Sequence, residues 1–391
     1  MNNAKKIMKN QGVKTAVSPR RVSSGMELKT KVLLILGILA AAGLCGIVLF
    51  INLRPRPVLT VTGTDSNGKA VTNTVNYKDV VYDIYATETQ YNSMEQLYQQ
   101  FYGSTFWEAE NVDSAGRNGA SAAKKELMDS LKQREILYME AQKNNITLTD
   151  DEKKEVDDEV SEALKAMSDT QKKIKGLEED TIRANIEKRT IAEKQKDKII
   201  SDLGIDEEAL KATVSKTDYR QYTLQYYTIP KTESDGNDGT KALSAEQLAK
   251  NKKAIEDVQK KAAKAEDFSK NIITDSNEDN TDDSTGVEYG THDLIETDTD
   301  FLDAKTRKAV KKMKNNEVSG VLETDEAFYV IKMVNNNDTE AYDEQCDTVV
   351  SQEKESKFSE KYKNDIKPNY TTEVQSYWKG RVTLGGITSG N

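Results

Sequence analysis

The chain has 391 residues and a formal net charge of −10, with 36% hydrophobic and 31% charged residues. A chain of this length holds two or three domains at about 100–200 residues each. Its charge is unevenly placed: residues 1–31 carry eight Lys and Arg against one Glu, a net +7, which leaves −17 for residues 32–391. Because the phosphates of a nucleic acid would repel so acidic a chain, we expect no nucleic-acid partner.

An uncharged apolar run follows the basic segment, from Val32 to Ile51. Twenty helical residues span about 30 Å, the hydrocarbon thickness of a bilayer. Basic residues favour the cytoplasmic side. We therefore expect a cytoplasmic tail at 1–31 and a single-pass transmembrane signal anchor at 32–52 in contact with the lipid bilayer. The bulk of the chain would then be extracytoplasmic at the cell membrane. A cleaved signal peptide is the alternative, but the run is long for a signal core and no small-residue cleavage site follows it.

Residues 53–217 predict a mainly helical module with a short β element at its start. Alternating residues on both sides of a Ser-Asn-Gly turn indicate a hairpin within 58–90. No proline occurs between Pro57 and Pro230, which permits long helices. Apolar stripes at helical spacing predict helices over 127–141, 156–167 and 182–199.

Two capping boxes predict helix starts in this module, Ser93 with Gln96 and Thr149 with Glu152. The apolar stripes have two interpretations. They are buried inside a helical bundle, or some of them stay exposed and bind other polypeptides. The sequence favours burial for any single stripe.

Residues 218–338 change character and predict an α+β domain with an antiparallel sheet. Residues 222–229 alternate as a strand, and Ser244 with Gln247 starts a helix. After an acidic loop, residues 317–322 and 328–334 are typical of paired strands. The remaining residues, 339–391, form a C-terminal extension with a possible helix between Tyr362 and Trp378.

Few residues offer metal or nucleophile chemistry. His292 is the only histidine, which excludes a histidine-rich metal site and leaves one candidate base for a Ser/His/Asp set. The acidic segment 275–283 fails the calcium-loop pattern, because Asn280 stands at the glycine position and Gly286 where a glutamate belongs. We expect neither a metal nor a cofactor.

The order of these elements resembles extracytoplasmic foldases of the PrsA and SurA type. The helical module carries Asn144-Asn145-Ile146-Thr147-Leu148-Thr149 before a helix, which is similar to SurA-like chaperone domains. The second module resembles the parvulin-type, PpiC-like peptidyl-prolyl isomerase domain. Its matching segments are 226–229, 266–268, Gly286 with Gly290, 316–320 and 328–332.

This resemblance implies a site. Parvulins usually carry a histidine on the first strand and another on the last, and those positions fall on Tyr227 and Tyr329 here. Asp279 falls at the usual acidic or cysteine position, with Asp275 as the alternative. The implied catalytic residues are thus Tyr227, Tyr329 and Asp279. The implied substrate-binding residues are Phe301, Leu302, Thr306, His292 and Phe328.

Two functions follow from the resemblance. The first is a membrane-anchored extracytoplasmic folding factor, a peptidyl-prolyl cis-trans isomerase that assists unfolded or proline-containing secreted polypeptides. The alternative is a non-catalytic holdase chaperone whose degenerate parvulin domain only binds peptide. The two tyrosines at histidine positions favour the alternative, and the overall resemblance favours the isomerase. A structural or envelope-scaffolding protein is a third interpretation.

Overall fold

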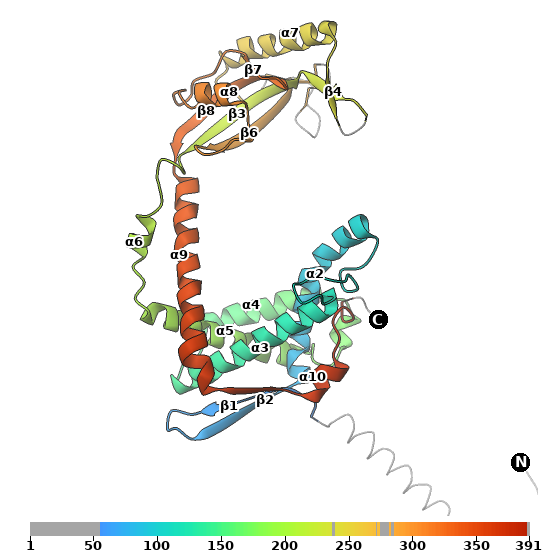
Figure 1. Cartoon of the computed structure of the whole chain (residues 1–391), viewed down its shortest axis with the longest axis vertical. Coiled ribbons are helices and arrows are strands. Elements are labelled where there is room, and N and C mark those ends of the chain that lie inside the picture. The colour runs from blue at the N-terminus through green and yellow to red at the C-terminus, as the bar shows by residue number, and fades with distance from the viewer. Residues whose placement is uncertain (1–54, 237–238, 271, 274–280, 283–284, 389–391) are drawn as a thin grey trace, which may run out of the picture.

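The computed structural model describes residues 55–236, 239–270, 272–273, 281–282 and 285–388 (Figure 1). Within these ranges, no helix has both the length and the apolar composition to cross a bilayer. The expected anchor, residues 32–52, lies outside the described residues. The predicted fold class is therefore corrected: the described part is a mixed α+β fold with antiparallel sheets, and the transmembrane helix is not part of it.

The N-terminal hairpin is formed as predicted, by β1 (Pro57–Thr64) and β2 (Ala70–Asn76). The chain turns between them with Gly68 at φ +77°, a conformation that glycine adopts without strain. The hairpin ends earlier than expected, because Asn76 and Asp79 form a capping box that starts a 3₁₀ turn, η1 (Tyr77–Val80).

Helix α2 (Val81–Tyr102) follows this turn directly, so residues 81–90 are helical and not part of the β element. The predicted start at Ser93 is wrong, because Ser93 lies inside α2. The helix ends at Gly103, whose φ of +66° is typical of a glycine C-cap.

Four helices complete this helical part: α3 (Gly119–Lys143), α4 (Asp150–Ala166), α5 (Glu179–Asp202) and the short α6 (Glu207–Lys211). The capping box of Thr149 and Glu152 is confirmed at the start of α4. Apolar side chains of α3 pack on β1, and those of α4 and α5 form a second core with the start of α2.

The second part is a four-stranded antiparallel sheet in the order β6-β3-β8-β7. Its central strands are β3 (Gln221–Pro230) and β8 (Ala327–Asp338), and the outer strands are β6 (Glu288–Ile295) and β7 (Leu322–Glu323). Strand β6 was not predicted: it falls where the sequence analysis expected loop. A small hairpin, β4 (Thr232–Ser234) and β5 (Thr240–Ala242), follows β3.

One helix covers each face of this sheet. Helix α7 (Ala245–Ala262) packs on one face with Ile255 and Val258, and Ser244 caps its N-terminus as predicted. Helix α8 (Ala304–Val310) packs on the opposite face with Val310. The two faces of β3 and β8 are therefore in different environments.

The C-terminal segment returns to the N-terminal part (Figure 1). Helix α9 (Glu340–Lys361) leads from the second sheet to the helical part, where two short turns follow, η3 (Tyr362–Ile366) and η4 (Lys367–Asn369). Strand β9 (Thr371–Val374) then pairs with β1, and α10 (Ser376–Arg381) packs beside it. The possible helix between Tyr362 and Trp378 is thus wrong for residues 371–374. The domain boundaries stay a prediction.

Candidate functional site

The register of β3 and β8 decides which aromatic side chains meet. Thr228 pairs with Tyr329, and Tyr227 pairs with Val330. Because side chains alternate between the faces of a sheet, Tyr226 and Tyr329 share one face and Tyr227 points to the other. The structure therefore does not bring the two predicted catalytic tyrosines together.

Tyr227 lies in the core beneath α7. Its side chain is fully buried, and its hydroxyl donates a hydrogen bond of 2.6 Å to the carbonyl oxygen of Phe268. Burial raises the pKa of Tyr227 far above its ordinary value. Phe328 is buried in the same core. Neither side chain is placed to contact a substrate on the α8 face.

Four ring side chains gather on the α8 face: Tyr226, His292, Phe301 and Tyr329. The ring of Phe301 lies 4.0 Å from that of His292 and 5.3 Å from that of Tyr226, between centroids. The ring of Tyr329 lies 6.0 Å from each of Tyr226 and Phe301. These residues come from β3, β6, β8 and the loop before α8. We call them the aromatic cluster.

Both tyrosine hydroxyls of the aromatic cluster stay protonated at physiological pH. Burial is the main reason that the pKa values of Tyr226 and Tyr329 are raised, and a hydrogen bond with the Thr228 side chain opposes the shift at Tyr329. A protonated phenol both donates and accepts a hydrogen bond. The cluster thus places two hydroxyl groups beside an apolar ring.

His292 occupies β6 opposite Leu224. Burial lowers its pKa, and the charges of Asp298 and Asp293 oppose that shift. The ring therefore favours the neutral form at pH 7. Its Nε2 atom is buried and has no hydrogen-bond partner among the described residues.

The loop before α8 presents Phe301. Leu302 has a φ of +65°, which is rare for a bulky residue, and its backbone is held by the Arg307 guanidinium, which donates to the carbonyl oxygens of Thr299 and Leu302. Leu302 is half-buried beside the cluster. The loop thus places the ring of Phe301 next to Tyr226 and Tyr329.

Thr306 does not add an apolar side chain to the aromatic cluster. It is buried at the start of α8, where its hydroxyl donates to Asp303 Oδ2 at 2.7 Å and its N–H to Asp303 Oδ1 at 3.0 Å. Asp303 is the N-cap of α8. Phe301, not Thr306, supplies the ring that contacts Tyr226, His292 and Tyr329. Asp279 and Asp275 lie outside the described residues.

Tyr226 is the site residue that sequence reasoning missed. The motif comparison selected Tyr227, because that tyrosine aligned with the usual histidine. The period-two rule applied to β3 and β8 together would have selected Tyr226, provided that the pairing of Thr228 with Tyr329 was known.

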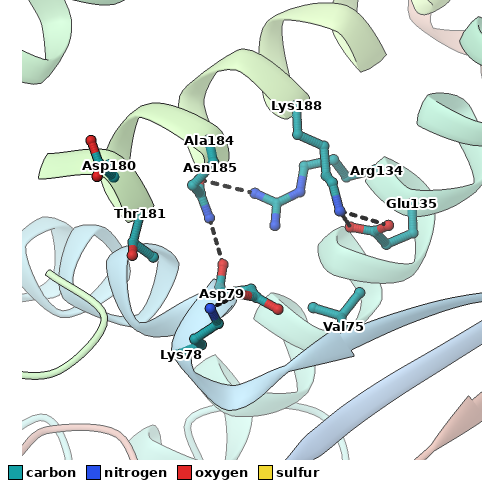
Figure 2. Close-up of a pocket in the computed structure, with 10 residues that line it drawn as sticks. All are labelled: Val75, Lys78, Asp79, Arg134, Glu135, Asp180, Thr181, Ala184, Asn185 and Lys188. Atoms are coloured by element: carbon teal, nitrogen blue, oxygen red, sulfur yellow. Dashed lines mark hydrogen bonds and ion pairs between the residues drawn. The ribbon is translucent and has the colours of Figure 1, made fainter. Parts of the chain in front are cut away.

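A separate polar cavity of about 370 Å³ lies in the helical part, lined by residues from η1, α3 and α5 (Figure 2). Two of its charged side chains, Arg134 and Lys188, form close ion pairs. Arg134 forms a bidentate ion pair with Asp83 at 2.6 and 2.9 Å, and Lys188 pairs with the fully buried Glu135 at 2.9 Å. Asn185 joins η1 to α5 through the Asp79 carbonyl. This network connects helices.

The comparisons with known proteins identify the class of the second part. Residues 237–335 match the family model described as rotamase, PPIC-type PPIASE domain. This part of the chain is therefore similar to a parvulin-type peptidyl-prolyl isomerase domain. No curated protein sequence matches the chain.

Among solved structures, the chain is similar to foldase protein PrsA from Streptococcus pneumoniae, with 18% identity over 64% of this chain and 89% of that one, at a TM-score of 0.29. It is also similar to PrsA from Bacillus subtilis, with 18% identity over 71% of this chain and 94% of that one, at a TM-score of 0.19. The family model confirms the predicted resemblance of the second part to a parvulin-type domain.

Proposed function

We propose that the chain is a folding factor whose sheet domain isomerises prolyl peptide bonds in polypeptide clients. The observation that carries this proposal is the aromatic cluster, which lies on one face of a PPIC-type domain. Phe301 offers an apolar surface for a proline ring, and Tyr226 and Tyr329 offer hydroxyls to the peptide bond.

The chemistry needs no bond to break. Rotation about the peptide bond meets a barrier of about 18–20 kcal/mol, which comes from amide conjugation. In the twisted state the amide nitrogen recovers its lone pair and accepts a hydrogen bond. A hydroxyl that donates to this nitrogen only in the twisted state lowers the barrier. One of the two tyrosine hydroxyls performs this role. The neutral ring of His292 stacks on Phe301 and keeps the surface around it apolar.

An isomerisation assay on proline peptides tests the proposal. We expect one of the two variants Tyr226→Phe and Tyr329→Phe, the one that removes the donor to the twisted amide nitrogen, to lower kcat/KM by about tenfold. Phe301→Ala should mainly raise KM. Tyr289→Phe is the matched control, since Tyr289 packs on Tyr227 on the opposite face. Wild-type protein that accelerates no proline peptide contradicts the proposal.

A non-catalytic holdase is the second candidate, and a surface on α2 favours it. Met94, Leu97 and Phe101 are 39%, 55% and 70% exposed, which is unusual for such large apolar side chains at helical spacing. We call them the α2 apolar stripe. A cavity of about 630 Å³ lies beside it, lined in part by Tyr91, Met94, Tyr98 and Phe106.

Suppression of aggregation separates the two candidates. Replacing Leu97 and Phe101 by Ser should reduce suppression if the stripe holds clients, while proline isomerisation stays unchanged. Lys153→Ser, on exposed α4, is the control. Equal suppression by wild type and the Leu97/Phe101 variant contradicts a role for the stripe.

The proposal includes secreted polypeptides as clients and an extracytoplasmic location for residues 53–391. Its support is the charge asymmetry of the sequence, with +7 in residues 1–31 and −17 beyond them. Protease treatment of intact cells tests the location. Digestion of the sheet domain is expected, and protection until the cells are lysed contradicts it.

A further inference from the structure

The charged groups that act on the aromatic cluster are all acidic. Glu288 raises the pKa of Tyr226 and of Tyr329, and Glu326 raises that of Tyr329. Asp298 raises the pKa of His292. A substrate bound at the cluster therefore meets a negative potential from more than one side.

One of these carboxylates shares the face of the aromatic cluster, and another lies in the turn that precedes Tyr329; we call the two the rim. Glu288 pairs with Thr228 across β6 and β3, and Thr228 pairs in turn with Tyr329, so the pleat places Glu288 on the face of the cluster. Glu326 ends the turn before β8, three residues before Tyr329. Both glutamates are exposed, and neither forms an ion pair with another described residue.

The half-buried cations next to the Phe301 loop do not balance this charge. Arg307 donates to the main-chain carbonyls of Thr299 and Leu302. Lys311 binds the main-chain carbonyl of Glu296 and pairs with its carboxylate at 3.2 Å. These two cations hold the loop in place and are not directed at the rim glutamates.

We propose that the aromatic cluster selects proline segments that carry Lys or Arg beside the proline. The proposal rests on the proposed function, since it names the substrate class of the same site. When the proline ring lies against Phe301, a neighbouring residue of the client reaches the rim formed by Glu288 and Glu326. A basic side chain there gains two carboxylate partners, and an acidic one is repelled.

Peptides of the form Ala-Xaa-Pro-Phe, with Xaa as Lys, Arg, Leu or Glu, test this selection. We expect kcat/KM for Lys and Arg to exceed that for Glu by about fivefold at low ionic strength, as exposed charge pairs allow. The ratio should approach one at about 1 M salt, where the Debye length is near 3 Å. Leu should lie between the two charged classes.

Substitutions of the two rim glutamates test whether these residues cause the preference for basic peptides. Glu288→Gln and Glu326→Gln should each reduce the Lys-to-Glu ratio, because each removes one carboxylate that attracts the basic side chain. Glu233→Gln is the matched control, because Glu233 is an exposed carboxylate of the same domain on the β4–β5 hairpin. A ratio that does not change in the Glu288 and Glu326 variants overturns the proposal.

The outcomes for the two proposals are separate. Equal kcat/KM for all four peptides overturns the selection and leaves the isomerase intact. Absence of acceleration for every peptide contradicts the isomerase, and peptide binding then tests the selection through the NMR signals of the His292 ring. Tighter binding of the Lys peptide supports the selection, and equal binding overturns it.

Discussion

His292 combines three features at the residue scale. It is the only histidine of the chain, its ring stacks on Phe301, and its Nε2 atom has no partner among the described residues. The resemblance to parvulins implied that this residue binds substrate. The structure places it against the ring that we propose to bind proline. Its role as a substrate contact stays a prediction.

The protonation of His292 should make both the stability and the activity of the protein depend on pH. Burial lowers its pKa in the folded protein below the unfolded value of about 6.5. The unfolded chain then binds more protons between these two values, so stability is lost as the pH falls below about 6.5. We also expect isomerase activity to fall in this range, because protonation places a charge beside Phe301.

NMR titration of the single histidine measures the midpoint directly. We expect a midpoint below about 6.5, and a His292→Gln variant whose activity no longer falls in that range. A midpoint above 6.5 contradicts the effect of burial.

At the scale of elements, two ion pairs at the polar cavity connect α3 to its neighbours: Arg134 pairs with Asp83 of α2, and Glu135 pairs with Lys188 of α5. Figure 2 shows the second pair. Glu135 on α3 is fully buried, and its partner Lys188 on α5 is 29% exposed. Removing one member of a buried pair leaves an uncompensated charge, which costs more than the pair itself contributes.

We expect Lys188→Met to lower the free energy of unfolding by about 2–4 kcal/mol, at the lower end because water reaches Lys188. Chemical denaturation of the full chain measures this. Lys198→Met is the matched control on α5, since its pair with Asp202 is exposed and should contribute under about 0.5 kcal/mol. Adding Glu135→Leu to Lys188→Met should recover stability. Equal stability of Lys188→Met and wild type contradicts the prediction.

The arrangement of the whole molecule depends on the C-terminal segment. Glu88 of α2 is fully buried, and its carboxylate accepts hydrogen bonds from the N–H groups of Gly385, Gly386 and Thr388. Gly385 adopts a φ of +95° and lies against the ring of Trp107. Two segments that lie 300 residues apart in sequence are thus joined at one carboxylate.

Adjacent glycines test this contact. A Cβ at Gly385 would lie 2.8 Å from the Trp107 ring, whereas a Cβ at Gly386 meets nothing within 4 Å. We expect Gly385→Ala to destabilise the helical part by about 2 kcal/mol or more, from backbone strain and the clash together. Gly386→Ala should be near neutral. Thermal unfolding followed by tryptophan fluorescence distinguishes them, and equal melting temperatures contradict the arrangement.

Local patterns in the sequence determined much of the fold. The capping box at Thr149 and the N-cap at Ser244 mark real helix starts, because the capping side chain accepts a hydrogen bond from the backbone N–H three residues away. Strand β3 was predicted from its alternation. Strand β6 was not, since an edge strand carries a weak and polar pattern.

Patterns in the sequence were thus sufficient to predict the α+β class of the described part, most of its helices and a resemblance to a parvulin-type domain. Only the tertiary structure decided that Tyr226, not Tyr227, meets Tyr329. This contact depends on strand register, because shifting the pairing of a strand by one residue moves every side chain to the other face of the sheet. The pairing of β3 with β8 joins residues about one hundred positions apart, so no local pattern specifies it. The position of the C-terminal segment against Glu88 is likewise a long-range contact that no local pattern encodes.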